Sequence, residues 1–135
     1  MIADTSGLFA YYNAGDASHH AVKPVVDGTT DRFVVSPFII GELDYLLGDR
    51  VGVDAELAAL AQFAVGAYDV APFDSEDIGR AVEVIDKYRD QNVGLTDASI
   101  VVLAHRYNTK QILTLDHRHF DVLRPLSGGR FKLLP

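Results

Sequence analysis

Four acidic residues stand at positions where their carboxylates could do chemistry together. Asp4 directly follows a short apolar segment at the start of the chain, and Asp116 directly follows a second one. Glu42 falls in the second turn of an expected helix, and Asp97 opens another. The chain has fifteen aspartates, so helix capping explains some of them. Asp4 and Asp116 are different, because an unpaired charge beside a buried strand is costly.

The elements that must position these acids alternate between strand and helix. The expected strands are short runs of apolar residues without alternation, at 1–3, 32–35, 68–72, 111–115 and 131–134. Such strands are typical of a parallel sheet with helices on both faces. The predicted fold class is therefore α/β, a three-layer α/β/α arrangement around a central, mostly parallel sheet. Ligands bind beyond the carboxyl ends of the strands in such sheets, where the four acids would gather.

Local signals place helices between these strands. Ser36 is a hydroxyl cap in front of a proline at the first helical position, which predicts a helix to residue 48. Asp74 and Asp77 form a capping-box pattern that predicts a helix to residue 90. Further helices are expected at 6–13, from Asp16 or Ser18 to 26, from a cap at Asp54 onward, and at 96–107.

Apolar spacing of three and four residues predicts which helix faces turn inward. In the helix that begins at Asp54, the apolar positions Leu57, Leu60, Ala61 and Ala64 recur at this spacing. In the helix that begins at Asp74 they are Ile78, Ala81, Val82, Ile85 and Tyr88. The helix at 96–107 is almost wholly apolar from 98 to 104, so we expect it to be buried on all sides.

Length and composition bound the class of protein. The chain has 135 residues, which predicts one domain spanning 1–135. It has no cysteine, which excludes disulfides, thiolate metal sites and a cysteine nucleophile. No apolar run approaches the ~18 residues of a membrane span, and the first residues lack the positive charge of a signal peptide. We therefore expect a cytoplasmic protein without a membrane partner.

Charge is distributed unevenly along the chain. The net charge is −7, but residues 87–135 carry 8 basic and 4 acidic side chains, while residues 1–86 carry 4 and 15. A basic C-terminal part beside an acidic centre suits a metal site that acts on a phosphate polymer. The candidate phosphate contacts are Arg118, Arg124, Arg130 and Lys132.

A cluster of four carboxylates requires a cation or a proton. Two carboxylates about 4 Å apart repel each other by roughly 4 kcal/mol at an effective dielectric constant of 20. Oxygen ligands without cysteine favour Mg²⁺, with Mn²⁺ as the other choice. One such ion, or two, can activate water and stabilise charge on a phosphate. The residues thus predict a metal-dependent hydrolysis or phosphoryl-transfer site without naming its substrate.

Four stretches of the chain carry a resemblance to a known family. They are IADTSGLFAYY around Asp4, VVSPFIIGELDYLL around Glu42, GLTDASIVVLAHRY around Asp97 and ILTLDHRHF around Asp116. Together they resemble the PIN-domain ribonucleases, specifically the VapC toxins of type II toxin–antitoxin pairs. The resemblance extends over essentially the whole chain in order and spacing.

The resemblance implies an active endoribonuclease. Asp4, Glu42, Asp97 and Asp116 match the acids that the family uses to bind metal and cleave RNA. Ser6 and Thr114 match hydroxyl residues that orient the acids. The family reaction uses metal-activated water and leaves a 5′-phosphate and a 3′-hydroxyl. We therefore expect an Mg²⁺-dependent enzyme, with Mn²⁺ as an alternative ion.

The family also implies partners and RNA targets. The sequences of these stretches are similar to those of actinobacterial members of the family. Some of these members cut the sarcin–ricin loop of ribosomal RNA, and others cut tRNA anticodon loops. We favour the sarcin–ricin loop, and with it inhibition of translation. The resemblance implies a homodimer and a VapB antitoxin whose C-terminal segment lies across the active groove, and operator DNA is contacted only through that antitoxin. A PIN-like module acting mainly through antitoxin and operator binding is the alternative.

Other side chains near these stretches have open interpretations. His117 and His119 flank Arg118 just after Asp116, and they either contact RNA or occupy a plain surface turn. A phosphatase of the haloacid dehalogenase type would need a second aspartate where the chain has Ser6. A receiver domain would need a lysine where His117 follows the last acid. Neither alternative fits the sequence.

Overall fold

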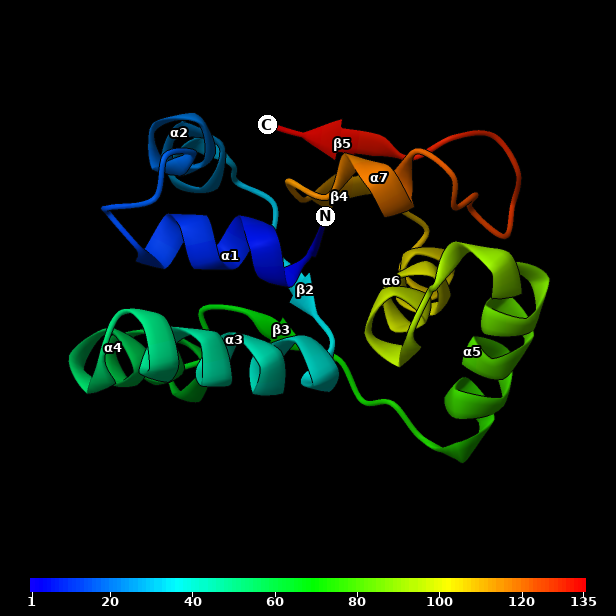
Figure 1. Ribbon diagram of the computed structural model, residues 1–135, viewed down its shortest axis with the longest axis horizontal. Coiled ribbons are helices and arrows are strands. Elements are labelled where there is room, and N and C mark those ends of the chain that lie inside the picture. Colours follow the sequence, from blue (N-terminus) through cyan, green and yellow to red (C-terminus); the bar gives the residue numbers. More distant parts are fainter.

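Five short parallel strands form the centre of the protein, whose computed structural model describes residues 1–135 (Figure 1). The strands are β1 (Ile2–Ala3), β2 (Val34–Val35), β3 (Asp69–Val70), β4 (Gln111–Leu113) and β5 (Lys132–Leu134). Their order in the sheet is β3-β2-β1-β4-β5, and every neighbouring pair is parallel. The predicted α/β class is confirmed, and the sheet is wholly parallel.

Helices fill the connections between the strands. They are α1 (Thr5–Tyr12), α2 (His19–Gly28), α3 (Pro37–Arg50), α4 (Val53–Ala64), α5 (Ser75–Lys87), α6 (Leu95–Arg106) and α7 (His117–Phe120), with a 3₁₀ turn at Arg89–Gln91. From β1 to β3 the chain moves toward one edge of the sheet, and then it crosses back to β4 on the other side of β1. Right-handed crossovers therefore place α1–α4 on one face and α5 and α6 on the other. Figure 1 shows the two groups on opposite sides of the strands. None of the helices combines the length and hydropathy needed to cross a lipid bilayer.

The reversal of strand order falls between β1 and β4, at the middle of the sheet. Strand β1 pairs with β2 on one side and with β4 on the other. The helices that follow β1 and β4 leave the carboxyl end of the sheet in opposite directions, which opens a crevice there. Asp4 directly follows β1, and Asp116 lies three residues after the end of β4, so both acids are placed at this crevice.

The buried core is centred on β1 and α6. Ile2 and Ala3 have no exposed surface, and every residue of α6 from Ala98 to Ala104 is buried. Each fully buried large aliphatic side chain stabilises the fold by about 1.5–3 kcal/mol. Helix α6 therefore behaves as the sequence predicts, with apolar contacts on all sides rather than along one stripe.

One buried polar contact fixes α6 against α3. The Ser99 hydroxyl has no exposed surface, and its Oγ lies 2.8 Å from Ser36 Oγ and 2.6 Å from the Thr96 carbonyl oxygen. Ser36 is the predicted N-cap of α3, and its Oγ accepts a hydrogen bond from the Phe38 amide at 3.2 Å. The beginnings of α3 and α6 are thus joined, and these are the helices that carry Glu42 and Asp97.

The prediction for the helix after Asp54 was wrong in its cap, and its apolar spacing does not mark the buried face. Helix α4 begins at Val53 after Gly52, whose φ of 136° is open to glycine, and Asp54 lies within the first turn. Leu57 is 58 % exposed, and the only fully buried residue of the helix is Ala59. Apolar side chains surround this helix, so spacing alone does not distinguish its inner face. Leu60 is half-buried, whereas Ala61 and Ala64 are exposed.

The helix after Asp74 has the predicted capping box but a different inner stripe. Asp74 Oδ1 accepts from the Asp77 amide, and Asp77 Oδ2 accepts from the Asp74 amide. The buried residues of α5 are Asp77, Ala81 and Val84, whereas Ile78 and Val82 are exposed. Asp77 takes the inner face because Arg106 of α6 pairs with it.

Several other boundaries differ from the predictions. Strands β2 and β3 are shorter than the predicted 32–35 and 68–72, and α3 continues to Arg50 rather than ending at residue 48. Helix α5 ends at Lys87 rather than at residue 90, and α2 continues to Gly28 rather than ending at 26. The predicted strand at 111–115 pairs only over Gln111–Leu113. After Leu113 the chain instead turns toward the site, where Leu115 and Asp116 donate their amides to the hydroxyls of Ser6 and Thr114. Half-buried Ile85 and Tyr88 still pack against the core as predicted.

A close contact between α1 and β4 gives the first testable prediction. A Cβ on Gly7 would lie 2.7 Å from Leu113 Cγ and 2.9 Å from the Leu113 carbonyl oxygen. We expect Gly7→Ala to lower the free energy of unfolding by about 1–3 kcal/mol, because helix and strand must separate. Gly79→Ala is the matched control, since a Cβ at this site on α5 meets nothing within 4 Å. It should raise stability by about 0.5–1 kcal/mol. Urea denaturation measures both, and equal effects would contradict the packing argument.

Candidate functional site

Asp4 is held beside β4 by the pairing of two parallel strands. The register joins Ala3 to Leu113, and the Asp4 amide donates to the Leu113 carbonyl oxygen at 2.9 Å. The residues that follow this pair on the two strands are Asp4 and Thr114. Both are buried, and Asp4 is only 6 % exposed.

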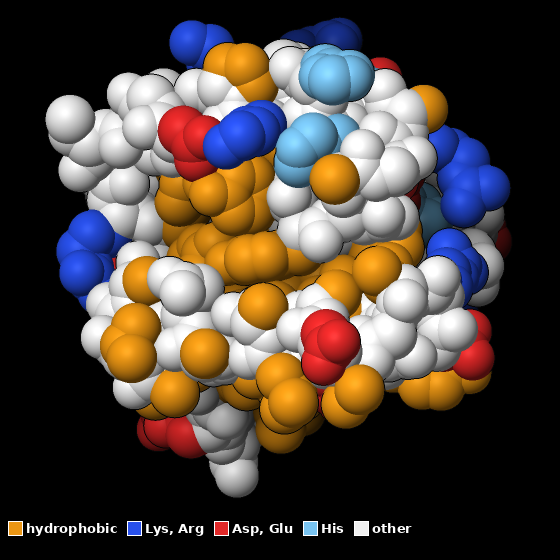
Figure 2. Space-filling view, turned by 90° about the vertical axis from the view of Figure 1, so that its left-hand side faces the viewer, with side chains coloured by type: hydrophobic (Ala, Val, Ile, Leu, Met, Phe, Trp, Pro, Cys, Tyr) orange, Lys and Arg blue, Asp and Glu red, His pale blue; other side chains and the backbone are white.

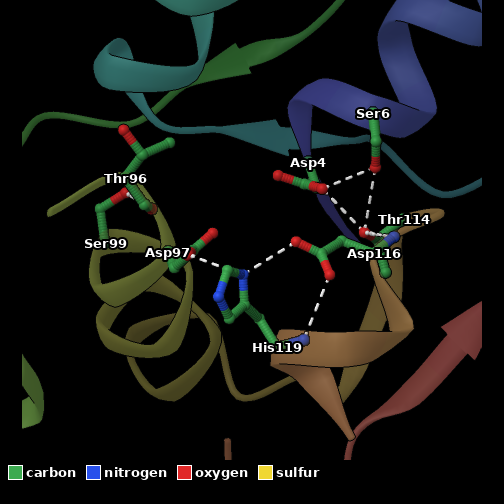
Figure 3. Close-up of polar contacts among 8 residues, drawn as sticks. All are labelled: Asp4, Ser6, Thr96, Asp97, Ser99, Thr114, Asp116 and His119. Atoms are coloured by element: carbon green, nitrogen blue, oxygen red, sulfur yellow. Dashed lines mark hydrogen bonds and ion pairs between the residues drawn. The ribbon is translucent and has the colours of Figure 1, made fainter. Parts of the chain in front are cut away.

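Two hydroxyl groups orient the Asp4 carboxylate. Ser6 Oγ and Thr114 Oγ1 each donate to Asp4 Oδ2 at 2.7 Å (Figure 3). Each hydroxyl also accepts a main-chain amide, from Leu115 at 2.9 Å and from Asp116 at 3.0 Å. A hydroxyl has one proton to donate, so both protons are committed to the same carboxylate oxygen. The other oxygen, Oδ1, is left without a bond from these hydroxyls, and Figure 3 shows it pointing away from them.

A histidine lies between Asp97 and Asp116. His119 Nδ1 is 2.9 Å from Asp116 Oδ2 and 3.3 Å from Asp97 Oδ2 (Figure 3). The His119 amide also donates to Asp116 Oδ1 at 3.1 Å, so Asp116 caps the short helix α7. The three side chains are mostly buried, with His119 14 % exposed and Asp97 19 % exposed. Of the two interpretations of His119, the plain surface turn does not fit the structure.

All four predicted acids line one groove with a volume of ≈ 290 Å³. Glu42 enters it from α3 as an exposed side chain, and Arg50, at the end of the same helix, also lines it. We call this feature the acidic groove, lined by Asp4, Ser6, Glu42, Arg50, Asp97 and Asp116. The expected gathering at the carboxyl edge of the sheet is observed for each of the four acids.

The charge on Asp97 is costly in the absence of a metal. Burial first, and then the nearby carboxylates of Asp4, Asp116 and Glu42, raise the pKa of its carboxyl from an ordinary 3.8 to about 6. Only the contact with His119 acts in the opposite direction. Helix α6 begins just before Asp97, and its dipole favours a negative charge there, yet desolvation is the larger effect.

The donors in this groove fit a divalent metal ion. Asp97, Asp116 and His119 present one ligand atom each within 4.8 Å of one another. Carboxylate oxygens are the ligands that Mg²⁺ and Mn²⁺ prefer, and the chain has no cysteine to favour zinc. The cluster could therefore hold such an ion, which would neutralise the repulsion between the acids.

Sequence reasoning placed some charged residues near the site and missed others. Of the candidate phosphate contacts, Arg118, Arg130 and Lys132 are exposed, and Arg124 Nη1 donates to the carbonyl oxygens of Asp121 and Leu123. None of these four lines the acidic groove. Arg50 does, and no spacing in the sequence signalled it. Asp44, two residues after Glu42 on the same helix, points elsewhere, toward Glu56.

The largest hollow of the surface lies away from the acids. It has a volume of ≈ 550 Å³ and appears as the apolar depression of Figure 2. We call it the apolar hollow, lined by Tyr11, Tyr12, Val26, Phe33, Ala58 and Tyr68 among others. Tyr12 and Tyr68 share a hydrogen bond of 2.6 Å between their hydroxyls at its wall. Helix α1 borders both features, with Asp4 and Ser6 near its beginning and the two tyrosines at its end.

A wholly parallel sheet with an acidic groove at its switch point defines a known class of domain. Residues 1–124 match the PIN domain family, and the chain belongs to this family. It is of the VapC type, since it is 51 % identical to "Ribonuclease VapC26" of Mycobacterium tuberculosis over 135 residues, all of both chains. The resemblance found in the sequence is confirmed.

A solved structure supports the fold independently. The crystal structure of Mycobacterium tuberculosis VapC20, described as a sarcin–ricin loop cleaving toxin, superimposes with a TM-score of 0.80. The match covers 85 % of this chain and 88 % of that one at 24 % identity. It shows that the two proteins share a fold.

The raised pKa of Asp97 gives the second testable prediction. The carboxyl of Asp97 keeps its proton up to about pH 6 in the folded protein, but only up to about pH 3.8 in the unfolded chain. The stability that this carboxyl contributes is therefore fully present below pH 3.8 and is lost as the pH rises through 6. With EDTA at neutral pH, Asp97→Asn should raise the free energy of unfolding by about 1–2 kcal/mol, after a discount for partial exposure. The gain should shrink as the pH falls toward 4.

Urea denaturation at several pH values measures this difference. The matched control is Asp31→Asn, an exposed carboxylate in the loop before β2. Its curve should run parallel to that of the wild type at every pH. If the Asp97→Asn curve does so as well, the carboxyl of Asp97 is not destabilised by its surroundings.

Proposed function

We propose that this protein is a metal-dependent endoribonuclease toxin, a single PIN domain spanning 1–135. The observation that carries the proposal is the acidic groove, in which Asp4, Glu42, Asp97 and Asp116 converge at the switch point of the sheet. The close VapC relative supports RNA as the substrate class. The reaction is hydrolysis of a phosphodiester bond that leaves a 5′-phosphate and a 3′-hydroxyl.

We assign each side chain a role from its burial and its hydrogen-bond partners. Asp4, Asp97 and Asp116 hold Mg²⁺, or Mn²⁺ in its place, and Glu42 completes the ligand set or positions water. The bound ion supplies activation of water and stabilisation of charge on the phosphate. Ser6 and Thr114 keep Asp4 Oδ2 occupied, so that Oδ1 faces the groove in one orientation. Such fixed orientation reduces the reorganisation needed during the reaction.

The proposed target is the sarcin–ricin loop of large-subunit ribosomal RNA, whose cleavage in the cytoplasm would inhibit translation. The description of VapC20 as a sarcin–ricin loop cleaving toxin supports this target through the shared fold. A groove open at the surface suits a structured RNA loop with its bases turned outward. A tRNA anticodon loop is the other target class that this geometry accommodates.

The partner that we propose is a VapB antitoxin, with operator DNA contacted only through it and with the toxin as a homodimer. The apolar hollow supports this partner, because it lies at the other end of α1 from the acidic groove and is large enough for apolar side chains. Beyond it, an arginine of the antitoxin would find the carboxylates that hold the metal. A role in antitoxin and operator binding alone would leave the convergence of four acids unexplained.

Cleavage by the free protein is the third testable prediction. Purified protein with Mg²⁺ should release one fragment from the 3′ end of the large ribosomal RNA in ribosomes, and EDTA should stop the reaction reversibly. Asp4→Asn should abolish cleavage without unfolding the protein, because it removes a ligand charge but keeps an oxygen that can accept from Ser6 and Thr114. Asp44→Asn is the matched control, since this acid lies two residues from Glu42 but outside the acidic groove. Gel analysis and end mapping give the result.

The outcomes separate the alternatives. Cuts in tRNA anticodon loops would replace the proposed target but retain the enzyme. Undiminished cleavage in thorough chelation would exclude the metal mechanism. A folded protein that binds antitoxin and cuts no RNA with either ion would support the non-enzymatic alternative.

Phosphate binding by the basic part of the chain is the fourth testable prediction. Arg118 is exposed beside Asp116 and has no ion-pair partner, so it is the leading candidate among Arg118, Arg124, Arg130 and Lys132. Arg118→Ala should weaken RNA binding and reduce the salt dependence by about one unit of slope. Arg89→Ala is the control, because Arg89 is paired with Asp86. Filter binding over a salt series measures both, and unchanged slopes for all four candidates would place the RNA elsewhere.

A further inference from the structure

His119 contributes a nitrogen to a site otherwise built from oxygen atoms. Its Nδ1 contacts Asp97 and Asp116, two of the acids proposed to hold the metal. These acids come from different elements, α6 and the turn before α7, and the imidazole is the side chain that lies between them (Figure 3). A cation bound between Asp97 and Asp116 would therefore lie next to this imidazole.

The local backbone holds this ring in place. Asp116 caps α7 through the His119 amide, so the acid and the histidine form one rigid turn. Phe120, the next residue, is buried, and the centroid of its ring lies 6.4 Å from the centroid of the Phe131 ring. His117 lies on the same turn but is exposed, and it has no side-chain contact with the acids. The side chain of His119 is thus held against Asp97 and Asp116, and that of His117 is not.

The donor spacing suits direct coordination. Neighbouring ligands of an octahedral ion, with bonds of about 2.1 Å, lie about 3.0 Å apart. His119 Nδ1 lies 2.9 Å from Asp116 Oδ2 and 3.3 Å from Asp97 Oδ2. An ion that replaces the hydrogen-bonded proton of Nδ1 would require only small shifts of these atoms. The imidazole would then be neutral, with its proton on Nε2.

We propose that His119 is a metal ligand through Nδ1, and that this nitrogen makes the site prefer Mn²⁺ to Mg²⁺. The inference rests on the proposed metal dependence of the ribonuclease. Mg²⁺ prefers oxygen ligands and retains several waters, whereas transition-metal ions accept imidazole nitrogen. One nitrogen among carboxylates therefore adds affinity for Mn²⁺ and little for Mg²⁺.

Metal binding to the full chain tests the inference without an activity measurement. The variant is His119→Asn, which keeps a short polar side chain but removes the ring nitrogen, and the matched control is His117→Asn on the same turn. Calorimetry with Mn²⁺ alone and Mg²⁺ alone should show that His119→Asn lowers the Mn²⁺ affinity by about tenfold. The Mg²⁺ affinity should stay within about twofold, because water can replace the ligand. His117→Asn should change neither.

A spectroscopic measurement distinguishes ligation from positioning. Pulsed electron paramagnetic resonance of bound Mn²⁺ should show coupling to a ligated imidazole nitrogen in the wild type and in His117→Asn, and none in His119→Asn. Absence of this coupling in the wild type would overturn the inference. So would an equal loss of both affinities, which indicates positioning of the carboxylates, or a gain of affinity in His119→Asn, which indicates that His119 competes with the ion.

The result is separable from the proposed function. Nitrogen-coupled Mn²⁺ in a protein that cuts no RNA would support the ligand assignment and contradict the ribonuclease. RNA cleavage with an ion that shows no nitrogen coupling would support the ribonuclease and contradict the ligand assignment.

Discussion

Main-chain pairing between β1 and β4 is the contact on which the acidic groove depends. These strands are more than one hundred residues apart in sequence, and their register joins Ala3 to Leu113. A shift by one residue would turn Thr114 away from Asp4, because successive side chains of a strand point to opposite faces. The buried hydroxyls then reinforce the register, since Asp4 Oδ2 receives hydrogen bonds from both sides of it. Strand pairing and site geometry are therefore one constraint.

Burial of the acids at the end of the sheet costs free energy, and it also strengthens their interaction with a cation. The core around β1 and α6 excludes water from the end of the sheet, which strengthens every charge interaction there. The same exclusion raises the pKa of Asp97. A surface cluster of acids would avoid this cost, but it would also bind a cation weakly, because water screens exposed charges.

The sequence predicted the features that follow from strand order and local caps. The apolar segments before Asp4 and Asp116 located the strand ends, and Ser36 and Asp74 located two helix starts. The apolar spacing of α4 did not mark its buried face, and the predicted inner face of α5 was wrong at Ile78 and Val82, both for a physical reason. Both helices have apolar residues on more than one side, and their inner face is decided by partners distant in sequence, such as Arg106 for Asp77. The sequence left the role of His119 open, because Asp116 and His119 come into contact only when the chain between them forms a helical turn, and α7 has only 4 residues.

The length of helix α1 also sets the distance between the acidic groove and the apolar hollow. Its 8 residues span about 12 Å, from Asp4 at one end to Tyr11 and Tyr12 at the other. An extended peptide covers this distance with about four residues, at roughly 3.3 Å each. A chain anchored by an apolar side chain in the hollow therefore delivers its next few residues to the carboxylates without a long linker. Short tethers give high local concentration, so even a weakly binding cation on such a chain would occupy the groove effectively.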